Sequence, residues 1–236
     1  MSGNFKDISL NNSRFERKFV LQNKGVLFAE HLVKLNQGFF KSIYQKRKVN
    51  NVYFDSPNLN NYYDNHFGKS SRAKVRIRWY GATFGKIENP VLEFKIKRGL
   101  VGRKESFPLK GFELNSNSTF KNWHSLFERS DLPDLVLNEL KTLVPTLVNS
   151  YERKYYLSND TNFRFTIDFN MKFFNTKSNG YEMSSFEEKD KVIMELKYDS
   201  EHDKAVKKIT SSLPIRLNKF SKYVRGIELF HPHLAV

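Results

Sequence analysis

Four cationic side chains alternate with apolar ones along residues 72–80, which is the spacing of one face of a β-strand. Arg72, Lys74, Arg76 and Arg78 share that face, and no acidic residue lies between them. Neighbours on a strand face lie about 7 Å apart, so their like charges repel each other unless an anion is close. Arginine also presents a planar fork of donors that fits phosphate oxygens. This segment therefore indicates a binding site for a polyanion.

Other predicted strands also carry charged residues on one face, and each of these faces includes a carboxylate. They are residues 14–21 with Glu16 and Lys18, residues 91–97 with Glu93, Lys95 and Lys97, residues 163–173 with Asp168, and residues 191–199 with Glu195 and Lys197. Carboxylates among cations could hold a divalent metal that bridges phosphate oxygens. The alternative is an antiparallel sheet with one solvated face, on which Glu16 and Glu93 pair with neighbouring cations and Glu195 forms a buried ion pair.

The composition agrees with an anionic partner and excludes several classes of protein. The 236 residues include 40 Lys+Arg against 25 Asp+Glu, a formal charge of +15, which favours nucleic acid, phosphate polymers, nucleotides or acidic membrane surfaces as partners. The absence of cysteine excludes a disulfide framework, zinc–thiolate sites and thiol catalysis. No apolar run reaches the length of about 18 residues that a membrane helix needs.

The alternation predicts mostly strands, with helices over residues 26–35, 120–127, 135–148 and 200–212. Several predicted strands are charged on one face and apolar on the other, so a closed sheet would line its lumen with the charged faces and pack the apolar faces outward against helices. Such a lumen carries too many charges to pack without water and an anion. We therefore expect an α+β protein with a closed antiparallel β-barrel and helices packed outside. It forms a single domain over residues 1–236, with flexible ends at 1–12 and 231–236.

Seven short segments, in this order, resemble the VTC domain, which is the polyphosphate polymerase domain of the vacuolar transporter chaperone complex. The segments are residues 14–20 (RFERKFV), 53–57 (YFDSP), 72–81 (RAKVRIRWYG), 92–95 (LEFK), 151–153 (YER), 194–197 (MELK) and 220–223 (FSKY). That domain belongs to the triphosphate tunnel metalloenzymes. The resemblance implies a tunnel of about eight antiparallel strands that binds a nucleoside triphosphate and a divalent metal.

The resemblance also implies the reaction and the residues that serve it. The terminal phosphate of ATP would be transferred to a growing polyphosphate chain, with Mn²⁺ or Mg²⁺ as cofactor. The implied catalytic cations are Lys18, Arg76, Arg78, Lys95, Arg153 and Lys222. Further substrate contacts are expected from Arg72, Lys74, Lys97, Lys104, Lys197 and Ser221. Glu195 would hold the metal, and Glu16 and Glu93 are the other candidate ligands.

One departure from the family pattern bears on the type of reaction. Hydrolytic tunnel enzymes begin with Glu-x-Glu-x-Lys, whereas this chain has Arg14-x-Glu16-x-Lys18. The loss of one carboxylate favours a polymerase over a hydrolase or cyclase. A non-catalytic module that binds polyphosphate or nucleotides, a triphosphatase of the same fold, and a protein that binds nucleic acid without sequence specificity stay open as alternatives.

The expected partners follow from this reading. They are ATP and inorganic polyphosphate, with no sequence-specific nucleic acid and with a membrane protein as a further option. We expect a cytoplasmic location, or a peripheral one at a membrane through such a partner.

Overall fold

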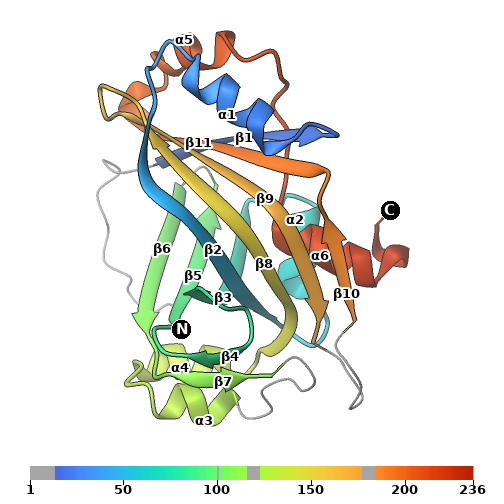
Figure 1. The fold of residues 1–236 in the computed structure, drawn as a ribbon. Coiled ribbons are helices and arrows are strands. Elements are labelled where there is room, and N and C mark those ends of the chain that lie inside the picture. The colour runs from blue at the N-terminus through green and yellow to red at the C-terminus, as the bar shows by residue number, and fades with distance from the viewer. Residues whose placement is uncertain (1–13, 100, 116–122, 177–183, 236) are drawn as a thin grey trace.

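The computed structural model describes residues 14–99, 101–115, 123–176 and 184–235 (Figure 1). Its main feature is an antiparallel sheet in which eight strands follow one another side by side. In spatial order they are β1 (Arg14–Gln22), β11 (Lys191–Asp199), β9 (Phe163–Asn175), β8 (Val144–Leu157), β2 (Lys41–Asp55), β3 (Ser71–Tyr80), β5 (Val91–Arg98) and β6 (Val101–Pro108). A ninth strand, β10 (Ser185–Glu188), pairs with β9, while β4 (Gly85–Ile87) and β7 (Phe112–Leu114) form a separate pair.

The sheet is strongly curled but is not closed by backbone hydrogen bonds among the described residues. β1 and β6 are its two edge strands, and neither pairs with the other. The curl nevertheless brings the two ends of the sheet together, because Lys95 Nζ of β5 lies 3.3 Å from a carboxylate oxygen of Glu16 on β1. The α+β architecture and the number of strands agree with the sequence prediction, whereas the expected closed barrel is not seen.

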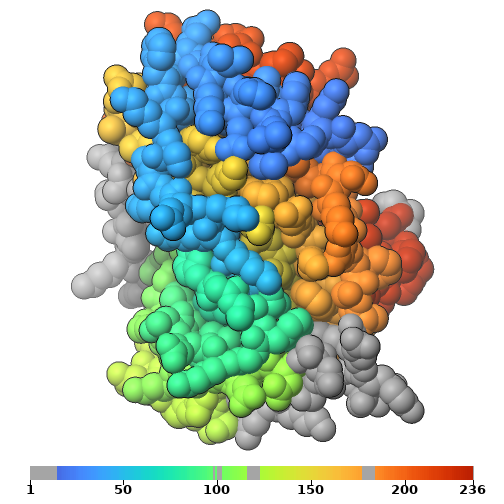
Figure 2. All heavy atoms as spheres, in the orientation of Figure 1, coloured from blue at the N-terminus to red at the C-terminus, as the bar shows by residue number. Residues whose placement is uncertain are grey.

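Helices cover the sheet on both sides. Two of them, α1 (Val26–Lys34) and α5 (Val206–Ser211), pack on the convex face of β9 and β11, and they lie together at one end of the molecule although they are distant in the sequence (Figure 2). The short helices α3 (Trp123–Glu128) and α4 (Asp134–Leu140) pack on the convex face of β3 and β5. On the concave side, α2 (Asn60–His66) and α6 (Lys222–Phe230) fill one end of the curl with a third apolar cluster.

The predicted helix over residues 135–148 is wrong in its second half. The helix α4 ends at Leu140, and Val144 already begins β8. Pro145 lacks the backbone N–H that a continuing helix would need, so the apolar residues after it follow the strand period. The helix predicted at 26–35 matches α1, and the one predicted at 200–212 divides into a 3₁₀ turn at Ser200–His202 and the helix α5.

The strand predicted at 163–173 is present, but its two faces exchange partway along. Asn170 has a left-handed backbone conformation, with φ of 51°. The sequence alternation predicts that Met171 and Phe173 share a face with Phe163. Instead they join the concave cluster that contains α6, while Phe163 packs under α1 and α5 on the convex face. This irregularity turns Met171 and Phe173 toward α6 on the concave side.

The ends of the chain were predicted to be flexible. Residues 1–12 and Val236 lie outside the described residues. At the other end, Pro232–Leu234 form a 3₁₀ turn, and the Tyr62 hydroxyl donates a 3.0 Å hydrogen bond to the carbonyl oxygen of Leu234. None of the described helices has the length and apolar character needed to span a bilayer. The assignment of residues 1–236 to a single domain stays a prediction.

Candidate functional site

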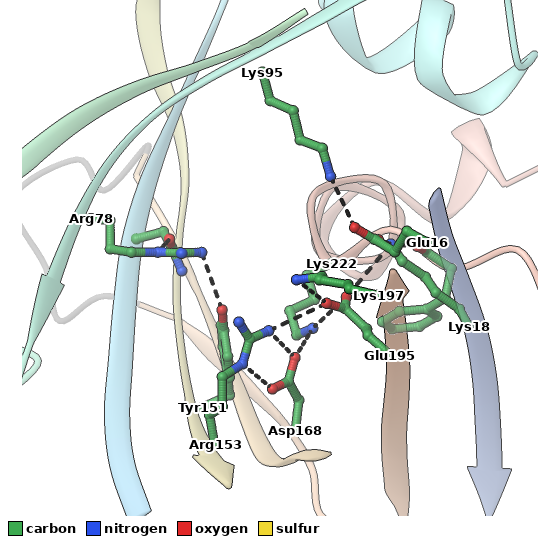
Figure 3. Close-up of polar contacts among 12 residues, drawn as sticks. Glu16, Lys18, Arg78, Lys95, Tyr151, Arg153, Asp168, Glu195, Lys197 and Lys222 are labelled. Atoms are coloured by element: carbon green, nitrogen blue, oxygen red, sulfur yellow. Dashed lines mark hydrogen bonds and ion pairs between the residues drawn. The ribbon is translucent and has the colours of Figure 1, made fainter. Parts of the chain in front are cut away.

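A cationic cavity of about 90 Å³ lies on the concave face of the curled sheet, against the N-terminus of α6. Its lining includes eight lysines and arginines and two carboxylates, so it carries a large excess of positive charge. The lining residues are Glu16, Lys18, Tyr53, Lys74, Arg76, Arg78, Lys95, Tyr151, Arg153, Glu195, Lys197, Phe220, Ser221, Lys222 and Tyr223. Figure 3 shows Arg78 and Lys95 pointing toward Arg153, Glu195 and Lys222 from the opposite side of the site.

At the base of the cavity, Asp168 holds two of the cations in place (Figure 3). Arg153 donates from Nε and Nη2 to the two carboxylate oxygens of Asp168 at 2.5 and 2.6 Å, and Lys222 Nζ donates at 2.5 Å. The Asp168 side chain is completely buried. Burial alone would raise its pKa, but Arg153 and Lys222 keep the pKa below its usual value, so the carboxyl stays ionised. Three elements, β8, β9 and α6, are joined by this group.

Glu16 and Glu195 form an alternating charge pattern with lysines on the paired strands β1 and β11. Lys18 is the cross-strand partner of Glu195, and Lys197 is the partner of Glu16. Lys18 Nζ lies 2.9 Å from Glu16 and 3.6 Å from Glu195, while Lys197 Nζ lies 3.1 Å from Glu195. Burial and the neighbouring Glu195 would raise the pKa of Glu16, but Lys18 and Lys95 lower it to about 2. Burial would also raise the pKa of Glu195, but Lys197 and Lys18 lower it well below its usual value, so both carboxylates are ionised at neutral pH.

The two arginines of β3 are oriented by residues behind the cavity. Arg76 Nε donates to Glu93 at 2.8 Å, and Arg78 Nε donates to the side-chain oxygen of Asn51 at 3.0 Å. Lys104 Nζ also lies 2.6 Å from Glu93. Burial would raise the pKa of Glu93, but Arg76 and Arg78 lower it to about 2. Arg76 Nη2 also lies 2.7 Å from Glu93. Each guanidinium is thus fixed from behind and keeps further N–H groups for an anionic ligand.

The N-terminal end of α6 forms another wall of the cavity. Ser221 caps the helix, because its hydroxyl oxygen accepts from the backbone N–H of Val224 at 3.3 Å, and it also accepts from Lys74 Nζ at 2.9 Å. Burial and the nearby Lys18 and Lys95 lower the pKa of Lys74. The positive end of the helix dipole adds to the attraction of the cavity for anions.

The close approach of α6 to the sheet depends on Gly226. A Cβ atom at this position would lie 2.3 Å from Leu147 Cδ2 and 2.8 Å from Phe173 Cδ1. Only a residue without a side chain lets the helix lie at this depth. Because Ser221 and Lys222 begin the same helix, Gly226 also determines where these two residues enter the cavity.

The carboxylates of the cavity fit a divalent metal that arrives with phosphates, and they do not form a complete site themselves. No cluster of three or more potential metal ligands exists among the described residues. Magnesium commonly binds through one or two carboxylates together with water and substrate phosphates, and Glu16 and Glu195 can supply these carboxylates. Glu93 and Asp168 are buried, and arginine and lysine side chains hold their oxygens.

Most of the residues predicted from the sequence come together in this cavity. The predicted catalytic cations Lys18, Arg76, Arg78, Lys95, Arg153 and Lys222 all line it, as do Lys74, Lys197, Ser221, Glu16 and Glu195. Four predicted residues are not part of the lining. Arg72 donates to the carbonyl oxygen of Lys69, Lys97 is half-buried further along β5, Lys104 is exposed, and Glu93 lies behind Arg76.

Several residues of the site were not predicted as site residues. Tyr151 lies under Lys222, whose Nζ is 4.6 Å from the ring centroid, and its hydroxyl is 3.4 Å from Arg78 Nη2. Tyr53 and Tyr223 stack at 5.0 Å along the same wall. All three tyrosines occur in the sequence segments that resemble the VTC domain, and Tyr151 shares a strand face with Arg153. This shared face could have identified it.

The chain is similar to a number of solved structures, which include the following two proteins. The PH1819 protein from Pyrococcus horikoshii OT3 is 13% identical, with a TM-score of 0.48, and the match covers 93% of this chain and 99% of that one. A proposed adenylate cyclase from Vibrio parahaemolyticus is 10% identical, with a TM-score of 0.48, over 90% of this chain and 97% of that one. No curated protein matches the sequence. A family model of the VTC domain matches residues 13–231, nearly the whole sequence, and the chain therefore belongs to the VTC domain family.

Proposed function

We propose that this protein transfers the terminal phosphate of ATP to inorganic polyphosphate inside the cationic cavity, with a divalent metal. The observation that carries the proposal is the convergence of eight lysines and arginines on a concave surface with two carboxylates. Such an excess of charge is costly to assemble unless an anionic ligand offsets it. Membership of the VTC domain family supports an enzyme that acts on triphosphates.

The cations of the cavity suit phosphoryl transfer because this reaction depends on positioning and charge neutralisation. Arg76 and Arg78 would bind non-bridging oxygens of one phosphate group while Glu93 and Asn51 hold the two guanidinium groups in place. Arg153 and Lys222, held by Asp168, would bind the adjoining group. The attacking oxygen belongs to a phosphate and is already anionic, so the reaction requires no general base from the protein.

Glu16 and Glu195 are the residues that would hold the metal. The resemblance to triphosphate tunnel metalloenzymes implies a divalent metal, and Mn²⁺ or Mg²⁺ would neutralise charge on the reacting phosphates when bound. In the structure Glu195 is held by Lys18, Lys197 and Arg153 at 3.1 to 3.6 Å. A bound triphosphate would compete with Glu195 for these cations and so release its oxygens.

A polymer also needs a path through the site, and the curled sheet offers one. We expect the sheet to act as a tunnel whose open side is bridged by side chains, as Lys95 and Glu16 do at 3.3 Å. Bound phosphates would draw the cations of β5 and β1 toward one chain and strengthen this closure.

The test is synthesis of polyphosphate by the purified protein from ATP with Mn²⁺ or Mg²⁺, followed by gel electrophoresis. Arg76→Ala should lower the rate about 100-fold, which is typical for the loss of one preorganised charged donor. Arg103→Ala is the matched control, because Arg103 lies on β6, is half exposed and pairs with Glu105 away from the cavity. Equal activity of the two variants would contradict the assignment of the cavity as the reaction site.

One observation keeps a non-catalytic binding module as a second candidate. All the carboxylates of the cavity are already engaged by lysines and arginines, as they would be in a site that only binds anions. Glu195→Gln separates the two functions, since a binding module should retain its affinity for polyphosphate and a metal-dependent polymerase should lose its activity. A triphosphatase would instead release orthophosphate from tripolyphosphate without chain growth.

A further inference from the structure

Three tyrosines surround an arginine on the concave face just beyond the cavity. The guanidinium carbon of Arg47 lies 4.6 Å from the ring centroid of Tyr44, 5.6 Å from that of Tyr80 and 5.7 Å from that of Tyr155. Tyr44 and Tyr155 also contact each other edge to face, with centroids 5.5 Å apart. We call these four residues the tyrosine cluster.

The tyrosine cluster directly adjoins two arginines of the cavity. Arg47 on β2 is the cross-strand partner of Arg153 on β8. Tyr155 follows Arg153 by two residues, and Tyr80 follows Arg78 by two residues, so each pair shares a strand face at a separation of about 7 Å. A ligand that reaches from the cavity past Arg78 and Arg153 therefore meets the cluster.

The tyrosine cluster is exposed to solvent, and its polar groups are open to a ligand. Tyr44 and Tyr80 are 49% and 53% exposed, and Arg47 is also exposed. Within the described part of the chain, the Arg47 side chain forms no ion pair with a carboxylate, and none of the three phenol hydroxyls has a hydrogen-bond partner. Burial raises the pKa of Tyr155 to about 12, so its ring is neutral at physiological pH. What the cluster offers to a ligand is ring faces and a guanidinium plane.

We propose that the tyrosine cluster stacks on the nucleobase of the nucleoside triphosphate whose phosphates occupy the cavity; this inference rests on the proposed function. Phosphate groups alone need cations, which the cavity supplies, and they gain nothing from exposed aromatic rings. A planar base gains dispersion and stacking energy from such rings and from arginine. Stacking on aromatic rings depends little on which base is bound, because every base has a π-face, so the cluster accepts different bases.

The experiment compares a ligand that has a base with one that lacks it. Affinities of the full chain for a nonhydrolysable ATP analogue and for tripolyphosphate are measured by calorimetry. The double variant Tyr44→Ala/Tyr80→Ala should bind the ATP analogue about tenfold more weakly, as expected for lost base stacking, and should bind tripolyphosphate unchanged. Both tyrosines are exposed, so the variant should fold normally.

Two variants serve as controls. Tyr44→Phe/Tyr80→Phe keeps the rings and should retain the affinity for the ATP analogue. Tyr63→Ala removes another exposed tyrosine, with an exposed fraction of 36%, from α2 and should change neither affinity.

The possible results separate the two proposals. An unchanged affinity of the double alanine variant for the ATP analogue would overturn the nucleobase assignment. So would an equal loss for both ligands, because the cluster would then serve phosphates. If the unaltered protein bound neither ligand, the proposed function itself would fall together with this inference.

Discussion

Replacing Asp168 with asparagine takes one negative charge from a buried group of three ionised side chains, of which Asp168 itself is completely buried. Arg153 and Lys222 then keep their positive charges in the protein interior, with the carboxylate of Glu195 as their nearest remaining counterion at 3.6 and 3.9 Å. Removing one partner from a buried ion pair costs about 3–5 kcal/mol. Because Glu195 offsets part of the charge and the amide oxygen can accept one hydrogen bond, we expect about 3 kcal/mol.

For a chain of this size, that loss corresponds to a fall in Tm of about 6–12 °C. The assay is thermal unfolding of the unaltered protein and of Asp168→Asn, each with and without tripolyphosphate. The anion should raise the Tm of the variant more than that of the unaltered protein, because bound phosphates restore negative charge beside Arg153 and Lys222.

The control is Glu187→Gln, which removes a carboxylate that pairs at the surface with Lys172 and Lys189. Surface ion pairs contribute little to stability, so this variant should have the same Tm as the unaltered protein. A Tm for Asp168→Asn within about 2 °C of the unaltered protein would refute the account of Asp168 as the anchor of two cavity cations.

Two further substitutions test the supports of the cavity. Gly226→Ala places a Cβ atom 2.3 Å from Leu147 Cδ2, so α6 must shift. We expect the free energy of unfolding to fall by about 1–3 kcal/mol and polyphosphate synthesis to be lost. Gly25→Ala, whose Cβ would have no atom within 4 Å, should change neither property. Equal behaviour of the two variants would contradict the packing argument. The pKa of Glu93 is lowered from 4.5 to about 2, so its contribution to stability is complete above pH 4.5 and is lost as the pH falls toward 2. Urea unfolding over this range should show less loss of stability on acidification for Glu93→Gln than for the unaltered protein, and parallel pH profiles would disprove the role of Glu93.

Sequence alternation predicted the charged face of β3 well because that strand is regular. Arg76 and Arg78 line the cavity, and Ile77 and Trp79 are buried on the opposite side. The same reasoning failed on β9, where one left-handed residue, Asn170, exchanges the two faces. Asparagine tolerates this conformation, but the apolar and polar residues alternate equally well without it, so the sequence carries no signal of the change.

The anchoring role of Asp168 and the curl of the sheet lay beyond the sequence for a different reason. Asp168, Arg153 and Lys222 lie on three separate elements. Their contact depends on the register between β8 and β9 and on the position of α6. Likewise, Lys95 and Glu16 are 79 residues apart in the chain and meet because the sheet curls. Alternation indicates which face a side chain occupies, but not which distant side chain faces it.

A crystal structure with a nonhydrolysable ATP analogue and Mn²⁺ tests the central claim most directly. The account predicts that the phosphates lie in the cavity within hydrogen-bond distance of Arg76, Arg153 and Lys222, with the metal on Glu16 or Glu195. Phosphates bound on the outer surface, beside a cavity in which Glu195 keeps its present lysine partners, would contradict it.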